Sequence, residues 1–458
     1  MIYKFNARLL VQKNGSKMIY TFPVVSATTS WEMPFSVPVM DVEILSQKGA
    51  TDYISPIRFD DIVRLQVSTK FNDSEKIVWQ DIFGGRILTP TVTFEPGKNT
   101  ARFNCVGHSD ESRTNLLVSN DGVPPLPYTT DKTIEGIFTT IMSIYPERLR
   151  FDTALEEDND VPENLDITDY EIKSNQKYLK DFFQDIEKIT GYAWFFRERP
   201  RYNSDGTLIT PTIIDFLPVK GTPSLPDSGV SYMNQFQSTW NVIVSGGTVT
   251  KIEINETDTQ KTSGTFVLTP WDKITITYTD APEWNWVPVS HKYKIIEGTQ
   301  RFLSANFSAK GDTVYTRAIE NGVTSGSHQM IGVAQNLTAV EKYGARYFSE
   351  TDTGFTSNVM CANFAAGVVE RFAYPINVGQ VVLHLTPEAQ IGDYVPVTIP
   401  SLDLNGSSIN NYFSVVKVQH DIPACTTTLD LGYVIDDPDK YLLKFAKMAH
   451  LAMKNFIS

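Results

Sequence analysis

Cysteine and long apolar runs are scarce in this chain of 458 residues. Its three cysteines, Cys105, Cys361 and Cys425, lie far apart and form no CxxC pair. This favours reduced core residues of a protein made in the cytoplasm over a disulfide framework. No apolar run is long enough to span a membrane, and the first residues alternate polar and apolar side chains. We therefore expect neither a signal peptide nor stable membrane insertion.

Positive charge is also scarce. The chain has 40 Lys and Arg against 53 Asp and Glu, which gives a net charge of -13. Binding to phosphates needs clustered Lys and Arg, so this balance argues against a surface that reads nucleic acid. We expect no sequence-specific nucleic-acid partner.

Catalytic signatures are missing as well. The sequence contains no HExxH, GxSxG, Walker loop or dinucleotide GxGxxG. Its acidic run, residues 156–160, lacks the oxygen spacing and the glycine of a calcium loop, which favours a solvated loop. We predict a protein that is not an enzyme, with no catalytic residues, no cofactor and no metal. The histidines are isolated in sequence and form no metal set or nucleophile-base pair: His108, His291, His328, His384, His420 and His450.

What the chain does contain is a three-strand pattern that occurs twice. Near residue 61 an Asp leads into Val63, Leu65 and Val67, which alternate with polar residues. Near residue 393 another Asp leads into a similar alternation, and in both copies a mixed strand and a closing strand follow. Alternation of period two indicates half-buried strands whose apolar side chains point into a core. In the second copy the inward residues are Val395, Val397 and Ile399. Any two antiparallel meanders look alike, but the shared order and the Asp before the first strand favour a duplication.

Composition and pattern together predict a mainly β protein with an α+β insertion. Abundant Tyr, Phe, Thr and Val favour strands, whereas residues 132–145 and 174–191 have the apolar spacing and caps of helices. The chain is too long for one core. We predict two similar β-modules, an α+β domain, an inserted β-domain and a C-terminal helix. The expected bounds are 1–118 for the first module, 119–225 for the α+β domain, 226–250 with 373–435 for the second module, 251–372 for the inserted β-rich domain with its helices, and 436–458 for the last helix. The resemblance described below implies that the two modules are tube-type β-barrel domains.

The C-terminal residues form a candidate site for a partner. Asp437-Pro438 is typical of a helix start, and the helix would carry apolar residues beside a row of lysines. Such a helix can cover an apolar groove while its positive side meets an acidic surface, or it can pack on its own subunit. The candidate partner-binding residues are Leu442, Lys444, Phe445, Lys447, Leu451 and Phe456.

These features together resemble the baseplate or tail hub proteins of tailed bacteriophages, including late-control and tail-associated proteins. The resemblance is carried by the doubled β-module, by the Asp-hydrophobic-Val strand starts, by residues 241–246 (NVIVSG) and by residues 185–194 (DIEKITGYAW). It implies a homotrimer in which two tube-type barrels per chain create a pseudo-sixfold ring.

The function that the resemblance implies is a structural hub of the tail tip or baseplate. Duplication would let a threefold spike or tip meet a sixfold tail tube, and the ring would leave a channel for DNA ejection. The implied partners are the tail tube or distal tail protein, the spike or tail-tip protein, the tape measure protein and baseplate wedge components. The implied location is the virion, after assembly in the host cytoplasm.

Two other functions stay open. Trp284 and Trp286 lie two apart on an expected strand, and could stack on sugar rings in a receptor- or carbohydrate-binding tail protein, although packing explains them equally well. A cell-wall hydrolase would need acids such as Asp185 or Glu187 in a cleft, but on a helix such residues are more often solvated.

Overall fold

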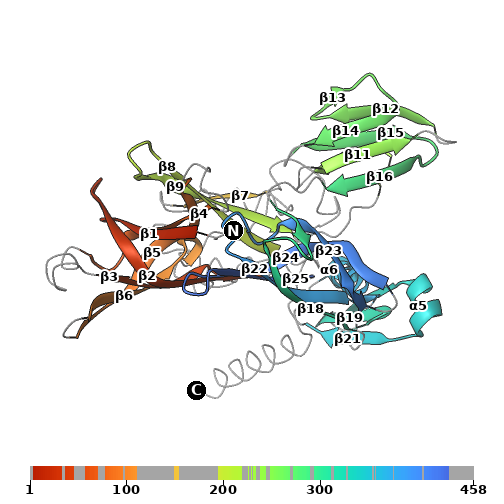
Figure 1. Ribbon diagram of the computed structural model, residues 1–458. Coiled ribbons are helices and arrows are strands. Elements are labelled where there is room, and N and C mark those ends of the chain that lie inside the picture. Colours follow the sequence, from red (N-terminus) through yellow and green to blue (C-terminus); the bar gives the residue numbers. More distant parts are fainter. Residues whose placement is uncertain are drawn as a thin grey trace, which may run out of the picture.

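The computed structural model describes residues 4–33, 37–45, 57–70, 78–95, 98–110, 149–153, 194–218, 225, 228–229, 231–233, 238–243, 248–268, 272–288, 293–310, 314–325, 328–352, 355, 357–374, 376–404 and 407–432. Most of these residues form strands, which confirms the prediction of a mainly β protein (Figure 1).

The first module is a closed barrel of six antiparallel strands, coloured red to orange in Figure 1. The strands pair in the order β1-β4-β5-β6-β3-β2, and β2 pairs with β1 to close the ring. As predicted, Val63, Leu65 and Val67 on β4 point into the core and are fully buried. The strands are β1 (Lys4–Gln12), β2 (Ile19–Glu32), β3 (Val39–Leu45), β4 (Ile62–Lys70), β5 (Gln80–Glu95) and β6 (Lys98–Val106).

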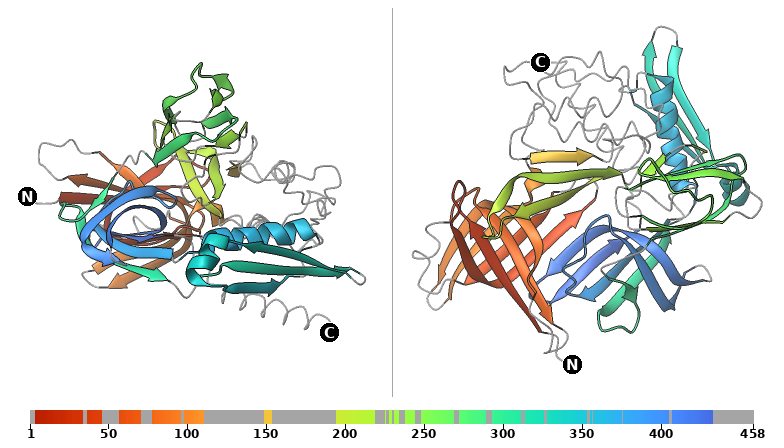
Figure 2. Two further views of the ribbon diagram at one scale, coloured as in Figure 1. Left: turned by 90° about the vertical axis from the view of Figure 1, so that its right-hand side faces the viewer. Right: turned by 90° about the horizontal axis from the view of Figure 1, so that it is seen from above.

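The second module, seen end-on as a blue ring in the left view of Figure 2, repeats this plan. Its strands follow the order β17-β23-β24-β25-β22-β18. β17 is only two residues long and pairs with β23 in parallel, whereas the other pairs are antiparallel. Val395, Val397 and Ile399 on β23 are buried, again as predicted. The strands are β17 (Ile295–Ile296), β18 (Phe302–Lys310), β22 (Ile376–His384), β23 (Tyr394–Leu404), β24 (Ser407–Asp421) and β25 (Thr426–Leu431).

The strand β18 corrects one part of our expectation for this module. We expected residues 226–250 to lie in it, but the strands that begin there pair in other sheets, and β18 pairs with β22 instead. Phe307 on β18 packs against Phe413 of the second core, with ring centroids 5.2 Å apart. β18 therefore takes the position in the second module that was expected for residues 226–250. The rest of the proposed division into domains stays a prediction.

The aspartate that precedes each first strand caps a turn. The carboxylate of Asp61 accepts a hydrogen bond from Arg58 N at 2.7 Å. The carboxylate of Asp393 accepts the equivalent bond from Gln390 N at 2.9 Å. In both turns the aspartate N–H donates in return to the carbonyl of the same partner. The feature that suggested a duplication is therefore a local hydrogen-bonding device.

The residue before each capping aspartate has the same unusual backbone. Asp60 has a φ of 67° and Gly392 has a φ of 76°, in the left-handed region that Gly and Asp tolerate best. Asp60 donates its N–H to Ile87 O on β5, and Gly392 donates its N–H to Val415 O on β24. The two modules thus match in strand order, in register and in the conformation of this turn.

Three smaller units accompany the two modules. The first contains β7 (Leu149–Thr153), β8 (Trp194–Tyr202) and β9 (Leu208–Pro218), in which β8 and β9 form an antiparallel ribbon around the expected turn at residues 203–206. The second has two small sheets with one core, formed by β10 (Ser231–Met233), β11 (Ser238–Ile243), β12 (Val249–Ile254), β13 (Thr257–Asp258), β14 (Gly264–Leu268), β15 (Lys273–Tyr278) and β16 (Glu283–Pro288).

The third unit is a three-stranded sheet that carries a helix on one face. It comprises β19 (Arg317–Ser325), β20 (His328–Gln335), α5 (Leu337–Tyr343), β21 (Tyr347–Thr351) and α6 (Asn358–Phe372). The helix α5 is capped by the side chain of Asn336, which accepts from Ala339 N at 2.9 Å. Asn is favoured at this position, because its side-chain oxygen accepts a hydrogen bond from an otherwise free N–H of the first turn.

Candidate functional site at the junction of the two modules

The two modules are joined by a continuous sheet. β2 of the first module pairs with β24 of the second over five residue pairs, from Thr28↔Asp421 to Glu32↔Lys417. The last pair adds an ion pair, with Lys417 Nζ 3.2 Å from Glu32 Oε2. From Thr28 to Ser30, β2 lies between two strands, because β3 occupies its other edge there.

The cores of the modules also exchange residues across this junction. Leu385 and Ile422 lie next to strands of the second module, yet their side chains pack in the core of the first module. Met33 of the first module packs in the core of the second. Hydrophobic contacts of this kind resist rotation of one module against the other, so the pair behaves as one body.

The ribbon of β8 and β9 lies over both modules, in yellow-green in the right view of Figure 2. Its main anchor to the first module is the carboxylate of Glu198. One oxygen accepts from Ser109 N at 2.8 Å and from Ser109 Oγ at 2.6 Å, and the other accepts from His108 N at 3.0 Å. Both residues lie in the short 3-10 helix η1 (His108–Asp110) that follows β6.

Glu198 needs a glycine opposite it. A Cβ placed on Gly107 would lie 2.5 Å from Glu198 Oε1, which is closer than real Cβ atoms come. Burial raises the pKa of Glu198, although its bonds to Ser109 and His108 act in the opposite direction. Since both oxygens already accept protein hydrogen bonds, this carboxylate holds the ribbon in place and is not presented to a substrate.

Further contacts join the ribbon to both modules. Arg197 donates from Nη2 to Ile391 O at 3.2 Å and lies 3.9 Å from the carboxylate of Asp393 in the second module. The Arg64 guanidinium of the first module lies 3.6 Å from the ring centroid of Tyr202. The ribbon thereby binds the turn aspartate of one module and a strand of the other.

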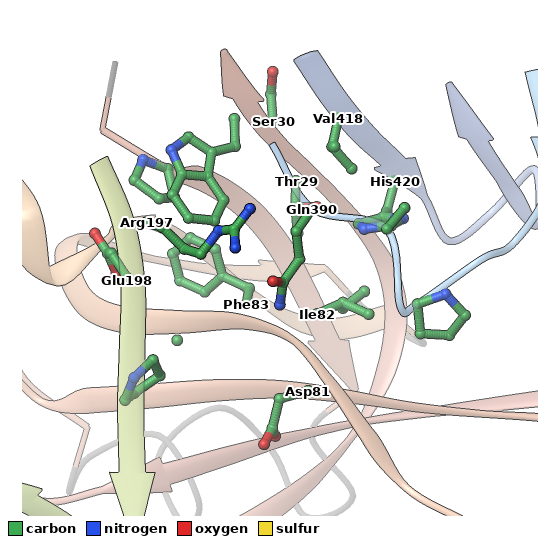
Figure 3. Close-up of a pocket in the computed structure, with 16 residues that line it drawn as sticks. Thr29, Ser30, Asp81, Ile82, Phe83, Arg197, Glu198, Gln390, Val418 and His420 are labelled. Carbon is green, nitrogen blue, oxygen red and sulfur yellow. The ribbon is translucent and has the colours of Figure 1, made fainter. Parts of the chain in front are cut away.

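A cavity of about 440 Å³ lies where the ribbon crosses the junction. Figure 3 shows Arg197 reaching from β8 toward Gln390 while Glu198 stays beside its strand. The cavity has aliphatic, aromatic, polar and charged walls, and among the residues that line it are Trp31, Phe83 and His420.

Two buried histidines flank this region. Burial lowers the pKa of His420 to about 4, and its Nδ1 lies 2.9 Å from Thr427 Oγ1. Burial, with a contribution from the Arg86 guanidinium, lowers the pKa of His108 to about 3. Both imidazoles are neutral near pH 7, so they act as polar members of packed cores.

Trp284, one of the two tryptophans considered for stacking on sugar rings, packs against a core. The ring of Trp284 is half-buried and stacks on the fully buried Trp240, with centroids 5.1 Å apart. It packs with the core between the two small sheets. This contact gives Trp284 a structural role, because an aromatic pair of this kind supports the fold of its own unit.

Several other predicted residues lie outside the described part of the chain. These are the acidic run 156–160, Asp185 and Glu187, the expected helices 132–145 and 174–191, His291, His450, and the candidate partner-binding residues Leu442, Lys444, Phe445, Lys447, Leu451 and Phe456. The three cysteines are described and carry free thiols. Within the described residues, no group of three or more His, Cys, Asp or Glu is placed to hold a metal ion. No helix in that same part is long and apolar enough to cross a membrane.

A known structure is similar to this chain in its fold. Prophage tail protein gp18 from Listeria monocytogenes EGD-e superposes with a TM-score of 0.51 over 96% of this chain and 98% of its own, at 12% sequence identity. The fold of this chain is that of a phage tail protein. The expected resemblance is thereby confirmed at the level of fold.

Other tail proteins match with lower scores. The 43 kDa tail protein of prophage MuSo2 from Shewanella oneidensis gives a TM-score of 0.49 at 8% identity, and covers 93% of this chain and 98% of its own. A tail protein from Neisseria meningitidis MC58 gives 0.46 at 10% identity, and covers 94% and 96%. The assignment of the fold rests on the Listeria protein. No protein-family model matches the chain, and no curated protein matches its sequence.

Few features of the sequence indicate the ribbon contacts. Residues 197–201 read Arg-Glu-Arg-Pro-Arg, which is typical of a solvated strand. One signal was present, because Phe196, Glu198 and Tyr202 share a face of β8 and two of these are aromatic. A single acid among aromatic residues on one strand face indicates a buried carboxylate with partners.

Proposed function

We propose that this protein is the structural hub of a phage tail tip or baseplate. In this proposal three chains form a ring with pseudo-sixfold symmetry, which joins the sixfold tail tube to a threefold spike or tip and leaves a channel for DNA. The observation that carries the proposal is the pair of like modules joined edge to edge through β2 and β24. Two similar modules per chain give six near-equivalent units from three chains, which resolves a mismatch between threefold and sixfold neighbours.

The junction supports a mechanical role for the chain. The exchanged core residues and the ribbon fix the two modules as one body, as a connector under load requires. The proposed neighbours are the tail tube or distal tail protein on one side, the spike or tail-tip protein on the other, and the tape measure protein and baseplate wedge components around the axis. The proposed location is the virion, after assembly in the host cytoplasm.

The test is the mass of the purified full chain in solution, followed by electron microscopy of the assembled particle. We expect a mass of three chains and density for the protein on the tail axis. A protein that stays monomeric at high concentration and in particles, or one that lies away from the axis, would contradict the proposal.

A further inference from the structure

The duplication lets each strand of the first module be matched to its equivalent in the second. Ala27 on β2 pairs with Val42, and Ala305 on β18 pairs with Val381. Both ladders have an irregularity near their start, between residues 24 and 26 and between residues 302 and 304. Residues 28–32 of β2 therefore correspond to residues 306–310 of β18.

The same comparison aligns β5 with β24. Ile87 pairs with Cys105 and Val415 pairs with Leu431, and in each strand an irregularity follows at once. Residues 89–93 of β5 thus correspond to residues 417–421 of β24. These are the residues of β24 that pair with β2 at the junction inside the chain.

Within one chain, the edges of β2 and β24 pair with each other at the junction. The equivalent edges of β18 and β5 do not pair with each other in the same chain. Residues 306–310 of β18 have β22 along one edge, and within the described residues no strand pairs with the other edge. Residues 89–93 of β5 have β6 along one edge, and here too no described strand pairs with the opposite edge. Open strand edges are templates for pairing with another chain.

We propose that β18 of one chain pairs with β5 of a second copy, in the register that β2 and β24 use within the chain. Asn306 then lies opposite Thr93, Ser308 opposite Thr91 and Lys310 opposite Thr89. The occupant is a second copy because this chain itself contains the matching edge. The inference rests on the proposed hub function, and it names the contact that would close the ring.

This contact is head-to-tail, because it joins two different surfaces. Such contacts form a closed ring when the rotation between neighbours divides a full turn, and an open filament when it does not. If the relation between chains repeats the relation between the modules of one chain, six modules from three chains complete the ring.

Pro90 makes the contact between chains weaker than the junction inside the chain. It stands where the second module has Val418, and it would lie opposite Ala309. Met33 N donates a hydrogen bond to Val416 O, so the backbone groups of Val416 face β2. Because this direction alternates along an antiparallel strand, the N–H of Val418, two residues further on, also points toward β2. Pro90 has no N–H to donate at that position, and its ring keeps the strands locally apart. A proline there also protects the edge from pairing with strands of other proteins.

Two substitutions in the full chain should act in opposite directions. Ala309→Pro removes the equivalent N–H from β18 and should weaken association about tenfold or more, whereas Pro90→Val should strengthen it by a similar factor. Association is measured by sedimentation over a range of concentrations, and circular dichroism checks that each variant keeps its strand content. If either variant associates like the unchanged protein, the proposed pairing is wrong.

Cross-linking provides a second, independent measurement. One chain carries Ser308→Cys, another carries Thr91→Cys, both have Cys425→Ser, and the two are mixed under mild oxidation. Residues that lie directly opposite each other in an antiparallel pair have Cα atoms about 4.5 to 5.5 Å apart, within the range of a disulfide. We expect a linked pair of chains, and no such product when Asn255→Cys replaces Ser308→Cys.

The outcomes separate this inference from the hub function. A trimer that forms without the cross-link, and that Ala309→Pro leaves intact, would overturn the pairing while the hub function stands. An unchanged protein that is monomeric in solution and in particles would overturn both.

Discussion

Two of the histidines that are isolated in the sequence are neutral members of the packed cores. The side chains of His108 and His420 are 4% and 3% exposed, and burial lowers the pKa values of both, to about 3 and about 4. The unfolded chain should protonate them near pH 6.5. Because the folded state then binds fewer protons than the unfolded state, stability present at pH 7 is lost as the pH falls below about 6.5.

We predict that this loss amounts to about 2 kcal/mol for each histidine between pH 7 and pH 5. Urea unfolding of the full chain at the two pH values should show it as a fall in the unfolding free energy. His108→Gln and His420→Gln should each reduce the fall by about 2 kcal/mol, since glutamine does not titrate. His328→Gln, at an exposed side chain, provides the control for replacement of a histidine by glutamine. If all three variants behave alike, the pH dependence arises elsewhere.

At the scale of elements, three hydrogen bonds to the carboxylate of Glu198 help to hold the ribbon of β8 and β9 on the first module. Glu198→Ala should leave two buried N–H groups and the Ser109 hydroxyl without their acceptor, at a cost of about 2 to 4 kcal/mol. We predict faster hydrogen exchange in β8 and β9, while the amides of β4 and β23 keep their protection. Glu198→Gln keeps one acceptor oxygen, so its rate of hydrogen exchange in β8 and β9 should lie between those of the unchanged protein and of Glu198→Ala.

The exposed Glu283 provides a matched control for this prediction, because Glu283→Ala removes a carboxylate without buried partners. If Glu198→Ala and Glu283→Ala leave exchange in the ribbon equally slow, other contacts, such as that of Arg197 with Ile391, hold the ribbon.

Elements with strong local patterns could be predicted from the sequence, whereas their long-range partners could not. The inward register of β4 and β23 follows from the alternation of apolar and polar residues. β18 joins the second module through its pairing with β22 and the contact of Phe307 with Phe413, and both partners lie far away in the sequence. The site was missed for a similar reason, because a buried Glu198 depends on backbone groups 90 residues away.

At the scale of the whole molecule, the described cores of the two modules are built from side chains up to Leu431. The C-terminal residues carry an apolar and lysine-rich pattern, from which the sequence predicts a role in assembly.

We therefore predict that deletion of the residues after Asp436 leaves both modules folded but weakens formation of the trimer or attachment of a partner. A helix of this length is marginal in water on its own, so it needs a surface to stabilise it. Thermal unfolding should give a similar midpoint for the main transition, while sedimentation should show weaker association or particle assembly should fall. Replacing Lys444 and Lys447 with Ala in the full chain tests whether charge contributes, because it removes two lysines and leaves the apolar residues unchanged. If the truncated protein assembles and binds its partners as well as the full chain, the helix covers only its own subunit, and the contact between β18 and β5 must hold the ring without it.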